Sequence, residues 1–321
     1  MRRISSHLTN RWLLHLFGIF LFVFILSRID LEETLQILLN TNLTYLSAAL
    51  ILLIPLILTK AWRWQFLMRI QDINYPLKDS FLMYSTGMFI GIITPGKLGD
   101  FIKILYLQKD GHSFGKSSVS VFIDRLFDLL SLLFIGYISL FVFISLFEEQ
   151  IIILSIFFIV TALIFILLVY KKGLNKKILR RFYILFIPER YKKNIRINFN
   201  DFYRDLHLLS KRGLVLVAIA TIIGWIIYFA MTYLLMLSLD IDMPVLYLIS
   251  CVSISGVISL IPISISGIGT RDAIFIVLFS HIGLSKESAI AFSTLILLAY
   301  MITAGVGLFT WFKKPIDKIF A

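Results

Sequence analysis

Long stretches of apolar residues without a charged side chain dominate this sequence. Eight such runs occur, at residues 12–27, 34–59, 80–96, 129–147, 151–170, 213–239, 243–270 and 288–312. A helix needs about 20 apolar residues to cross the hydrocarbon core of a bilayer, and several of these runs reach that length. Only 16% of the residues are charged, whereas soluble domains have about 25%. The sequence therefore predicts an all-helical membrane protein with several spans.

Cysteine and histidine are too sparse for disulfide, metal or redox chemistry. The chain has one cysteine, Cys251, inside an apolar run, and its five histidines are scattered without a pair four residues apart. An internal disulfide needs two cysteines, and transition-metal sites need clustered ligands. We therefore expect no metal ion and no other cofactor.

The basic residues are concentrated in one segment. Residues 171–212 contain 13 Lys or Arg and three Asp or Glu, a local net charge of +10 in a chain of net charge +12. Cytoplasmic loops of membrane proteins are rich in Lys and Arg, so this segment indicates the cytoplasmic side of the plasma membrane. With both termini also on that side, 25 of the 31 Lys and Arg are cytoplasmic. We interpret residues 171–212 as a cytoplasmic loop that contacts anionic lipid rather than any specific nucleic acid.

Aromatic and basic residues alternate at Trp62, Arg63 and Trp64, shortly after the apolar run 34–59. Trp is enriched where a membrane meets water, and Arg at that level stays hydrated. We interpret these three residues as an interfacial anchor at the cytoplasmic end of a span.

Two regions fit the predicted orientation only if the chain enters and leaves the membrane on the same side. In the first, residues 80–95 enter from the cytoplasm, and the next apolar stretch, 101–107, is too short to cross. In the second, residues 244–265 enter from outside and residues 273–283 return. The predicted fold is an all-α polytopic membrane protein, one integral membrane domain over residues 1–321. It has six full transmembrane helices and two oppositely oriented re-entrant helical hairpins.

The two hairpin regions form an internal repeat of opposite orientation. A shift of 170 residues places Gly99 on Gly269, and a long apolar helix follows each hairpin. We place the first repeat at about residues 80–147 and the second at about residues 244–312. Inverted repeats with broken helices near the membrane midplane are typical of secondary transporters.

The turn of each predicted hairpin combines glycines with charged residues. The residues concerned are Gly96, Lys97, Gly99 and Asp100 in the first turn, and Gly267, Gly269, Arg271 and Asp272 in the second. Glycine permits a sharp turn, and each returning helix begins with free N–H groups and a positive dipole end. A lipid phosphate can bind there with help from Lys97 or Arg271. The alternative is that glycine and proline only kink a packed helix whose charges pair locally.

A third group of charges, Asp124, Arg125 and Asp128, lies near the cytoplasmic start of a long apolar helix. Asp124 and Asp128 share one helix face, Arg125 reaches Asp128, and Lys103 is spaced to pair with Asp100. We predict that Arg125 holds a headgroup phosphate; alternatively, the three residues form a structural salt bridge. The residues assigned to charge pairing or to proton or cation coupling are Asp100, Lys103, Asp124, Asp128 and Asp272.

These motifs resemble the transmembrane domain of the lysylphosphatidylglycerol synthase/flippase family, which includes the membrane half of multiple peptide resistance factors and many stand-alone proteins. The resemblance covers nearly the whole chain and is carried by residues 91–100 (GIITPGKLGD), Asp124-Arg125 with Asp128, Pro262, and residues 267–272 (GIGTRD). The family motifs typically read P-G-R-x-G-E, E-R-x-x-D, and G-x-G followed by an acid. Here the first Arg is Lys97, and Asp stands where Glu is usual, at Asp100, Asp124 and Asp272.

The resemblance implies a lipid-handling protein of the cell envelope, with flippase activity as the family's mechanistic assignment and antimicrobial peptide resistance as one outcome. We expect a phospholipid or polyprenyl phosphate to move between leaflets, its phosphate held by Lys97, Arg125 and Arg271. The alternatives are a membrane-embedded transferase that makes aminoacyl-phosphatidylglycerol or a lipid-linked sugar, and a scaffold for such an enzyme. Catalysis is less favoured, because we expect no room for the soluble aminoacyl-transfer domain of the family's synthases. The expected partners are membrane lipids, with a second copy of the chain and a separate lipid-synthesising enzyme as open alternatives.

Overall fold

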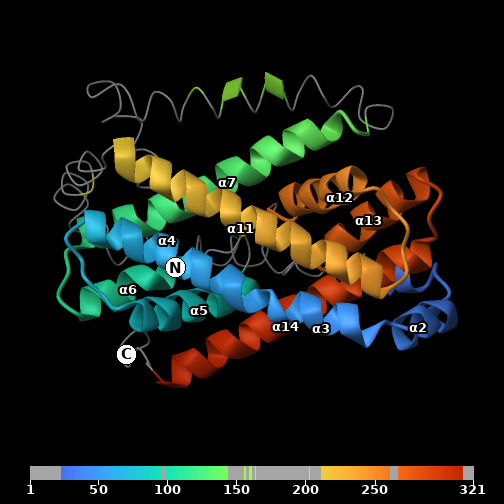
Figure 1. Ribbon diagram of the computed structural model, residues 1–321, viewed down its shortest axis with the longest axis horizontal. Helices are drawn as coiled ribbons and strands as arrows, with labels where there is room; N and C mark the ends of the chain where they lie inside the picture. Colours follow the sequence, from blue (N-terminus) through green and yellow to red (C-terminus); the bar gives the residue numbers. More distant parts are fainter. Residues whose placement is uncertain are drawn as a thin grey trace, which may run out of the picture.

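The computed structural model describes residues 23–94, 99–143, 211–260 and 267–313, with a few positions between 155 and 202. Within these ranges the regular structure is entirely helical, without a strand. The helices are α2 (Leu31–Leu39), α3 (Leu43–Ile51), α4 (Leu53–Ile70), α5 (Leu77–Ile93), α6 (Ile102–Lys109), α7 (Phe114–Leu140), α11 (Lys211–Ser238), α12 (Val245–Ile258), α13 (Thr270–His281) and α14 (Lys286–Lys313). Most of them run along the long axis of one bundle (Figure 1).

Some predicted features lie outside the described residues. They are the first apolar run up to residue 22, most of the run 151–170, most of the basic segment 171–212, Gly96 and Lys97 of the first turn, and Pro262.

Three helical segments are long and apolar enough to cross a membrane. They are Leu43–Ile70, Gly213–Ser238 and Lys286–Lys313, with mean hydropathies of 1.9, 2.5 and 2.1. At about 1.5 Å per residue, even the shortest exceeds the hydrocarbon core, which is about 30 Å thick. The last two segments coincide with the predicted runs 213–239 and 288–312. The prediction of an all-helical membrane protein is therefore confirmed.

The apolar run 34–59 does not form one membrane span, although its lack of charged residues suggested that it would. Helix α2 ends at Leu39, and the side chain of Asn42 caps the next helix by accepting hydrogen bonds from the backbone N–H groups of Thr44 and Tyr45. Asn is a preferred N-cap residue, so a new helix begins at this point. The spanning segment then continues beyond the apolar run to Ile70 and carries Arg63 within the helix.

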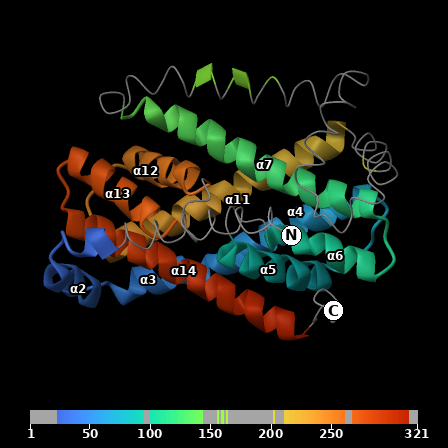
Figure 2. The same ribbon diagram turned by 180° about the vertical axis from the view of Figure 1, so that it is seen from behind.

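Two broken helices enter the bundle from opposite ends. Helices α5 and α6 lie in the left half of Figure 1, whereas α12 and α13 lie in the right half, and the reverse view in Figure 2 shows the same separation. Each pair is followed by a long helix, α7 after the first and α14 after the second.

The first helix of each broken pair packs on the long helix that follows the other pair. In α14, a Cβ atom added at Gly307 would collide with the backbone oxygen of Ser85 in α5. In α7, a Cβ atom added at Gly136 would lie 2.6 Å from the Cγ2 atom of Val257 in α12. Absence of a side chain thus lets both helix pairs approach closely, and the two halves of the chain interlock.

Side chains add a polar contact between α5 and α14 and an aromatic cluster between α13 and α14. The hydroxyl groups of Thr86 in α5 and Thr310 in α14 lie 3.0 Å apart and share a hydrogen bond. In the other half, the rings of Phe275, Phe279 and Phe292 form one cluster with centroids 5.3–5.9 Å apart. Aromatic clusters of this kind contribute more to the stability of the fold than the buried area of their rings alone would.

Substitution of Gly307 by Ala is expected to lower the free energy of unfolding by about 1–3 kcal/mol, because the added methyl group overpacks the α5–α14 contact. Gly305→Ala in the same helix is the matched control, since its Cβ would meet no atom within 4 Å. Thermal unfolding in detergent measures both variants. Equal unfolding temperatures for the two would contradict the proposed close packing.

Candidate functional site

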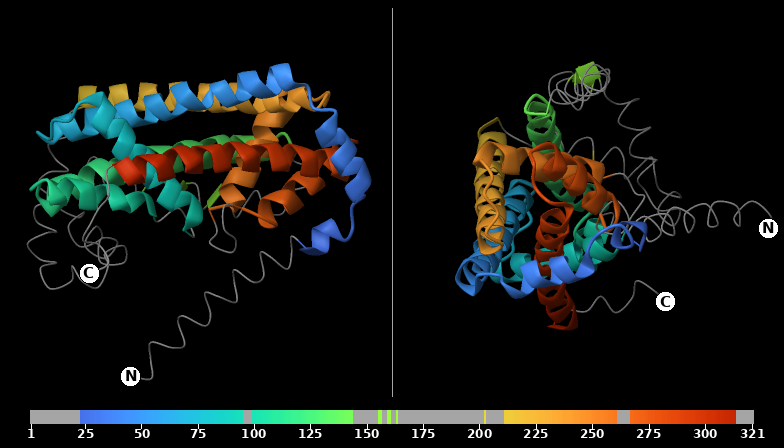
Figure 3. Two further views of the ribbon diagram at one scale, coloured as in Figure 1. Left: turned by 90° about the horizontal axis from the view of Figure 1, so that it is seen from below. Right: turned by 90° about the vertical axis from the view of Figure 1, so that its right-hand side faces the viewer.

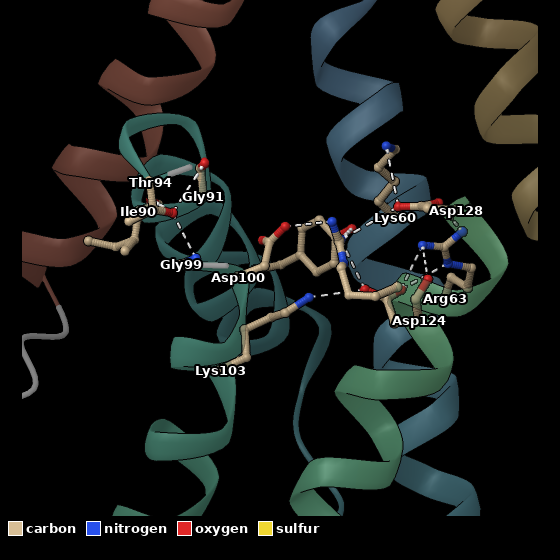
Figure 4. A network of polar contacts seen from close by, with 12 residues as sticks. Lys60, Arg63, Ile90, Gly91, Thr94, Gly99, Asp100, Lys103, Asp124 and Asp128 are labelled. Carbon is tan, nitrogen blue, oxygen red and sulfur yellow. Dashed lines mark hydrogen bonds and ion pairs between the residues drawn. The ribbon is translucent and has the colours of Figure 1, made fainter. Parts of the chain in front are cut away.

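The first turn is held together by a threonine. The Thr94 hydroxyl group donates a hydrogen bond to the carbonyl oxygen of Ile90 and accepts one from the N–H group of Gly99, each at 2.7 Å. A Cβ atom at Gly99 would collide with that same carbonyl oxygen, so only glycine fits this position. The turn delivers Asp100 to the start of α6 (Figure 4).

Asp124 is the centre of a buried ionic network. Its carboxylate is fully buried and accepts hydrogen bonds from Arg63 of α4, at 2.7 and 2.9 Å, and from Lys103 of α6, at 3.0 Å. Figure 4 shows these side chains converging from three helices. A buried carboxylate of this kind requires such compensation, because an unpaired charge away from water is very costly.

Arg63 uses all five of its N–H donors. They bind the Asp124 carboxylate twice, the Asp124 carbonyl oxygen, Asp128 at 2.7 Å and the hydroxyl group of Thr221 in α11 at 2.9 Å. Arg63 thus connects α4, α7 and α11 and has no donor left for a ligand. Its role is structural.

The interfacial interpretation of Trp62, Arg63 and Trp64 is wrong for two of the three residues. Trp62 is 40% exposed, whereas Arg63 is 1% exposed and Trp64 is fully buried. Arg63 was not predicted as a member of the site, because it lies beyond the apolar run 34–59. The signal that points to it is the absence of a helix-breaking residue between Thr59 and Ile70.

Arg125 forms the outer edge of the same network. Its guanidinium group pairs with Asp100 and donates hydrogen bonds to the hydroxyl group of Tyr84, at 2.6 Å, and to Asp124, at 3.1 Å. The predicted proximity to Asp128 is confirmed, with a nitrogen–oxygen distance of 3.6 Å. The Nε atom of Arg125 has no hydrogen-bond partner among the described residues.

The expected pairing of Lys103 with Asp100 does not occur. Lys103 instead binds Asp124, and its ammonium group lies 4.1 Å from the centre of the Tyr84 ring and 5.2 Å from that of Trp64. Aromatic faces stabilise a buried cation. Asp100 therefore forms its ion pair with Arg125.

Two glycines of α5 make room for the charged side chains of α6. A Cβ atom at Gly87 would lie 3.1 Å from the Cγ atom of Lys103, and one at Gly91 would lie 3.3 Å from the Cγ atom of Asp100. The two glycines are one helical turn apart and form a groove on α5. Asp100 and Lys103 occupy this groove.

Exposure divides the network into a centre and a rim. Asp124, Arg63 and Lys103 form the centre, with side chains at most 2% exposed. Lys60, Arg125 and Asp128 form the rim, with side chains 28%, 21% and 18% exposed. A ligand that approaches from outside therefore meets the rim first.

The second turn contains a separate and smaller cluster. Arg271 donates hydrogen bonds to the hydroxyl group of Ser293, at 2.8 Å, and to its carbonyl oxygen, at 3.1 Å. The same hydroxyl group binds Asp272, so one serine of α14 holds both charged residues. The Nη1 atom of Arg271 is buried and has no partner among the described residues.

The start of α13 is less open than expected. Gly267 and Gly269 adopt positive φ angles of +80° and +82°, which glycine adopts at little cost. Asp272 caps the helix by accepting a hydrogen bond from the N–H group of Gly269 at 2.8 Å. The free N–H groups of this helix start and the guanidinium group of Arg271 were both predicted to hold a phosphate. Because Asp272 already binds the N–H group of Gly269, the guanidinium group of Arg271 remains the more available of the two.

The predicted site residues thus fall into two clusters. Around Asp124 the structure brings together Asp100, Lys103, Arg125 and Asp128, with Lys60, Arg63 and Tyr84 as additions. Arg271 and Asp272 lie in the other cluster. No ion pair between described residues joins the two.

Comparison with known proteins links the chain to membrane proteins. Residues 12–307 match the family described as the lysylphosphatidylglycerol synthase TM region. A UPF0104 membrane protein of Methanocaldococcus jannaschii is 30% identical over 93% of this chain and 94% of its own length. A UPF0104 membrane protein of Methanothermobacter thermautotrophicus is 23% identical over 90% of each chain. No solved structure matches the chain.

Replacement of Arg63 by Gln is expected to lower the free energy of unfolding by about 3–5 kcal/mol, because Asp124 and Asp128 lose a buried partner. Arg69→Gln is the matched control, because Arg69 lies in the same helix but is exposed, and a change within about 0.5 kcal/mol is expected there. Denaturant unfolding in detergent measures both. An Arg63→Gln protein as stable as the control would refute the structural role.

Proposed function

Because the chain belongs to the lysylphosphatidylglycerol synthase TM-region family, we propose that it is a flippase that moves a phosphate-bearing lipid between the leaflets of the plasma membrane. The lipid is a phospholipid or a polyprenyl phosphate. The observation that carries the proposal is the partly exposed side chain of Arg125, at the rim of a buried ionic network. Guanidinium groups match the geometry of phosphate oxygens better than ammonium groups do.

The energetic cost of the network supports a role in ligand binding. Charged residues inside membrane proteins are expensive and usually mark transport pathways. A purely structural ion pair can often be replaced by apolar packing without loss of stability. Arg125 differs from Arg63 in that its side chain is partly exposed and its buried Nε atom has no hydrogen-bond partner among the described residues, so one of its donors is not used by the network.

The two broken helices support alternating access. In the proposed fold, α5–α6 and α12–α13 are re-entrant hairpins of an inverted repeat with six full spans, and both termini are cytoplasmic. Transporters of this plan expose a central site to each side in turn. Because α5 packs on α14 and α12 packs on α7, the moving units are these two interlocked pairs rather than the two halves of the sequence.

The phosphate travels along the guanidinium groups. It binds first to Arg125, with Lys60 beside it and with the predicted help of Lys97, and displaces Asp100 or Asp128 from that guanidinium group. The displaced carboxylate takes up a proton or a cation, which couples transport to an ion. The phosphate then passes to the Nη1 atom of Arg271, while the lipid tails stay in the bilayer.

A transferase would need a general base, and Asp124 is poorly suited to that task. Its two carboxylate oxygens already accept hydrogen bonds from Arg63, Lys103 and Arg125. A base must have a lone pair within reach of the proton that it removes. This arrangement favours transport over catalysis.

Replacement of Arg125 by Gln is expected to slow transport about 10- to 100-fold, because hydrogen bonds to a charged group contribute about 1.5–3 kcal/mol. The assay follows fluorescent phosphatidylglycerol or polyprenyl phosphate across the bilayer of proteoliposomes. Lys116→Gln is the matched control and should retain the wild-type rate, because Lys116 is a half-buried cation of the same helix that pairs with Asp72, a residue outside the network.

A second variant separates transport from folding. Arg125→Gln leaves Asp100 without its cation, whereas the double variant Asp100→Asn/Arg125→Gln keeps the net charge unchanged. The double variant should unfold near the wild-type temperature and still fail to transport. A wild-type protein that moves neither lipid, or a double variant with the full rate, would overturn the proposal.

A further inference from the structure

Helix α2 runs in a different direction from the long helices. In the left view of Figure 3, it crosses the right-hand end of the bundle instead of following its long axis. It contains nine residues, and the Asp30 carboxylate caps it by accepting hydrogen bonds from the N–H groups of Glu32 and Glu33. Short helices across the end of a membrane-spanning bundle suit the level where hydrocarbon gives way to water.

The residues of α2 fall into three faces. One face packs on the protein and consists of Thr34, Ile37 and Leu38. A second face is apolar and exposed, with Leu31 at 56%, Leu35 at 55% and Leu39 at 74%. The remaining face is polar and consists of Glu32, Glu33, Gln36 and Asn40.

The angles between these faces follow from helix geometry. Successive residues are about 100° apart, so the leucine face points about 110° to one side of the packed face and the polar face about 140° to the other side. A helix that rests on the bundle by one face thus presents leucines along the membrane plane and carboxylates toward water. This division is typical of helices that lie in a membrane interface.

Hydrogen bonds to the N-terminus of α14 fix the position of α2. The N–H group of Asp30 donates a hydrogen bond to the Glu287 carboxylate at 3.1 Å, and the Lys286 ammonium group donates one to the carbonyl oxygen of Arg28 at 2.6 Å. These contacts attach the segment before α2 to the first two residues of α14. The orientation of the leucine face is therefore set by the protein.

We propose that α2 is an interfacial helix whose leucine face inserts among the acyl chains of one leaflet. Lipid is the partner because the exposed apolar row does not end with α2. It continues over the turn onto the spanning segment, through Leu43, Ile51 and Ile54, with exposures of 74%, 63% and 59%. The partner of α2 is thus the same hydrocarbon that surrounds the span. This inference does not depend on what the protein transports.

Two adjacent positions test the proposal. Leu35→Cys and Gln36→Cys are each labelled with an environment-sensitive fluorophore in nanodiscs of phosphatidylglycerol and phosphatidylethanolamine. The Leu35 label should be quenched severalfold more strongly by spin-labelled lipid than by aqueous iodide, and the Gln36 label should show the reverse. Both side chains are exposed, so neither change disturbs packing.

Two further labels calibrate the measurement. Ile222→Cys, at an exposed position in the middle of α11, gives the response of a side chain in hydrocarbon. Wild-type protein treated with the same reagent reports any labelling of the buried Cys251. Quenching of the Leu35 label by iodide as strongly as that of the Gln36 label would overturn the proposal. Shielding of the Leu35 label from both quenchers would do the same, since it would show protein rather than lipid on this face.

Discussion

The charge balance around Asp124 is the constraint on which the first half of the molecule depends. A carboxylate with no contact to water must be neutralised by its neighbours, and Arg63, Lys103 and Arg125 do so from three different helices. Their side chains fix how α4, α6 and α7 sit against one another. The glycine groove of α5, the aromatic faces around Lys103 and the hydroxyl group of Tyr84 all serve to accommodate these charges.

The membrane spans, whose length and composition are set by the surrounding lipid, are the part of the fold that the sequence predicts best. The span Gly213–Ser238 was predicted almost to the residue. A charge-free run of that length is long enough to cross the bilayer, and within lipid a helix satisfies all of its backbone hydrogen bonds. Spacing along one helix also predicted that Asp124 and Asp128 share a face. The pairing of Lys103 was wrong, because spacing detects only partners within a helix, and its partner Asp124 is 21 residues away. Arg63 was missed because it lies beyond the apolar run 34–59 and because its partner Asp124 lies 61 residues further along the chain.

The two broken-helix pairs share an arrangement but differ in charge. In each pair a glycine lies just before the second helix, and the long helix that follows the pair holds a polar partner of its charged residues. The first pair belongs to a network with four cations and three carboxylates, whereas in the second a single Arg271–Asp272 pair shares Ser293. The two charged clusters are therefore unequal, although the helices around them are arranged alike.

The interlocked packing also sets the order in which the protein can be completed. Thr86 of α5 finds its partner Thr310 in the last helix, 224 residues later. Until the ribosome has made α14, the side of α5 that carries Thr86 and Phe89 lacks its partners, although the pairing of Asp100 with Arg125, only 25 residues apart, can already form. The ionic network is thus assembled early in synthesis and the contact between the two halves late. A chain that stops before α14 would keep its charged centre and lose the surface that closes the bundle around it.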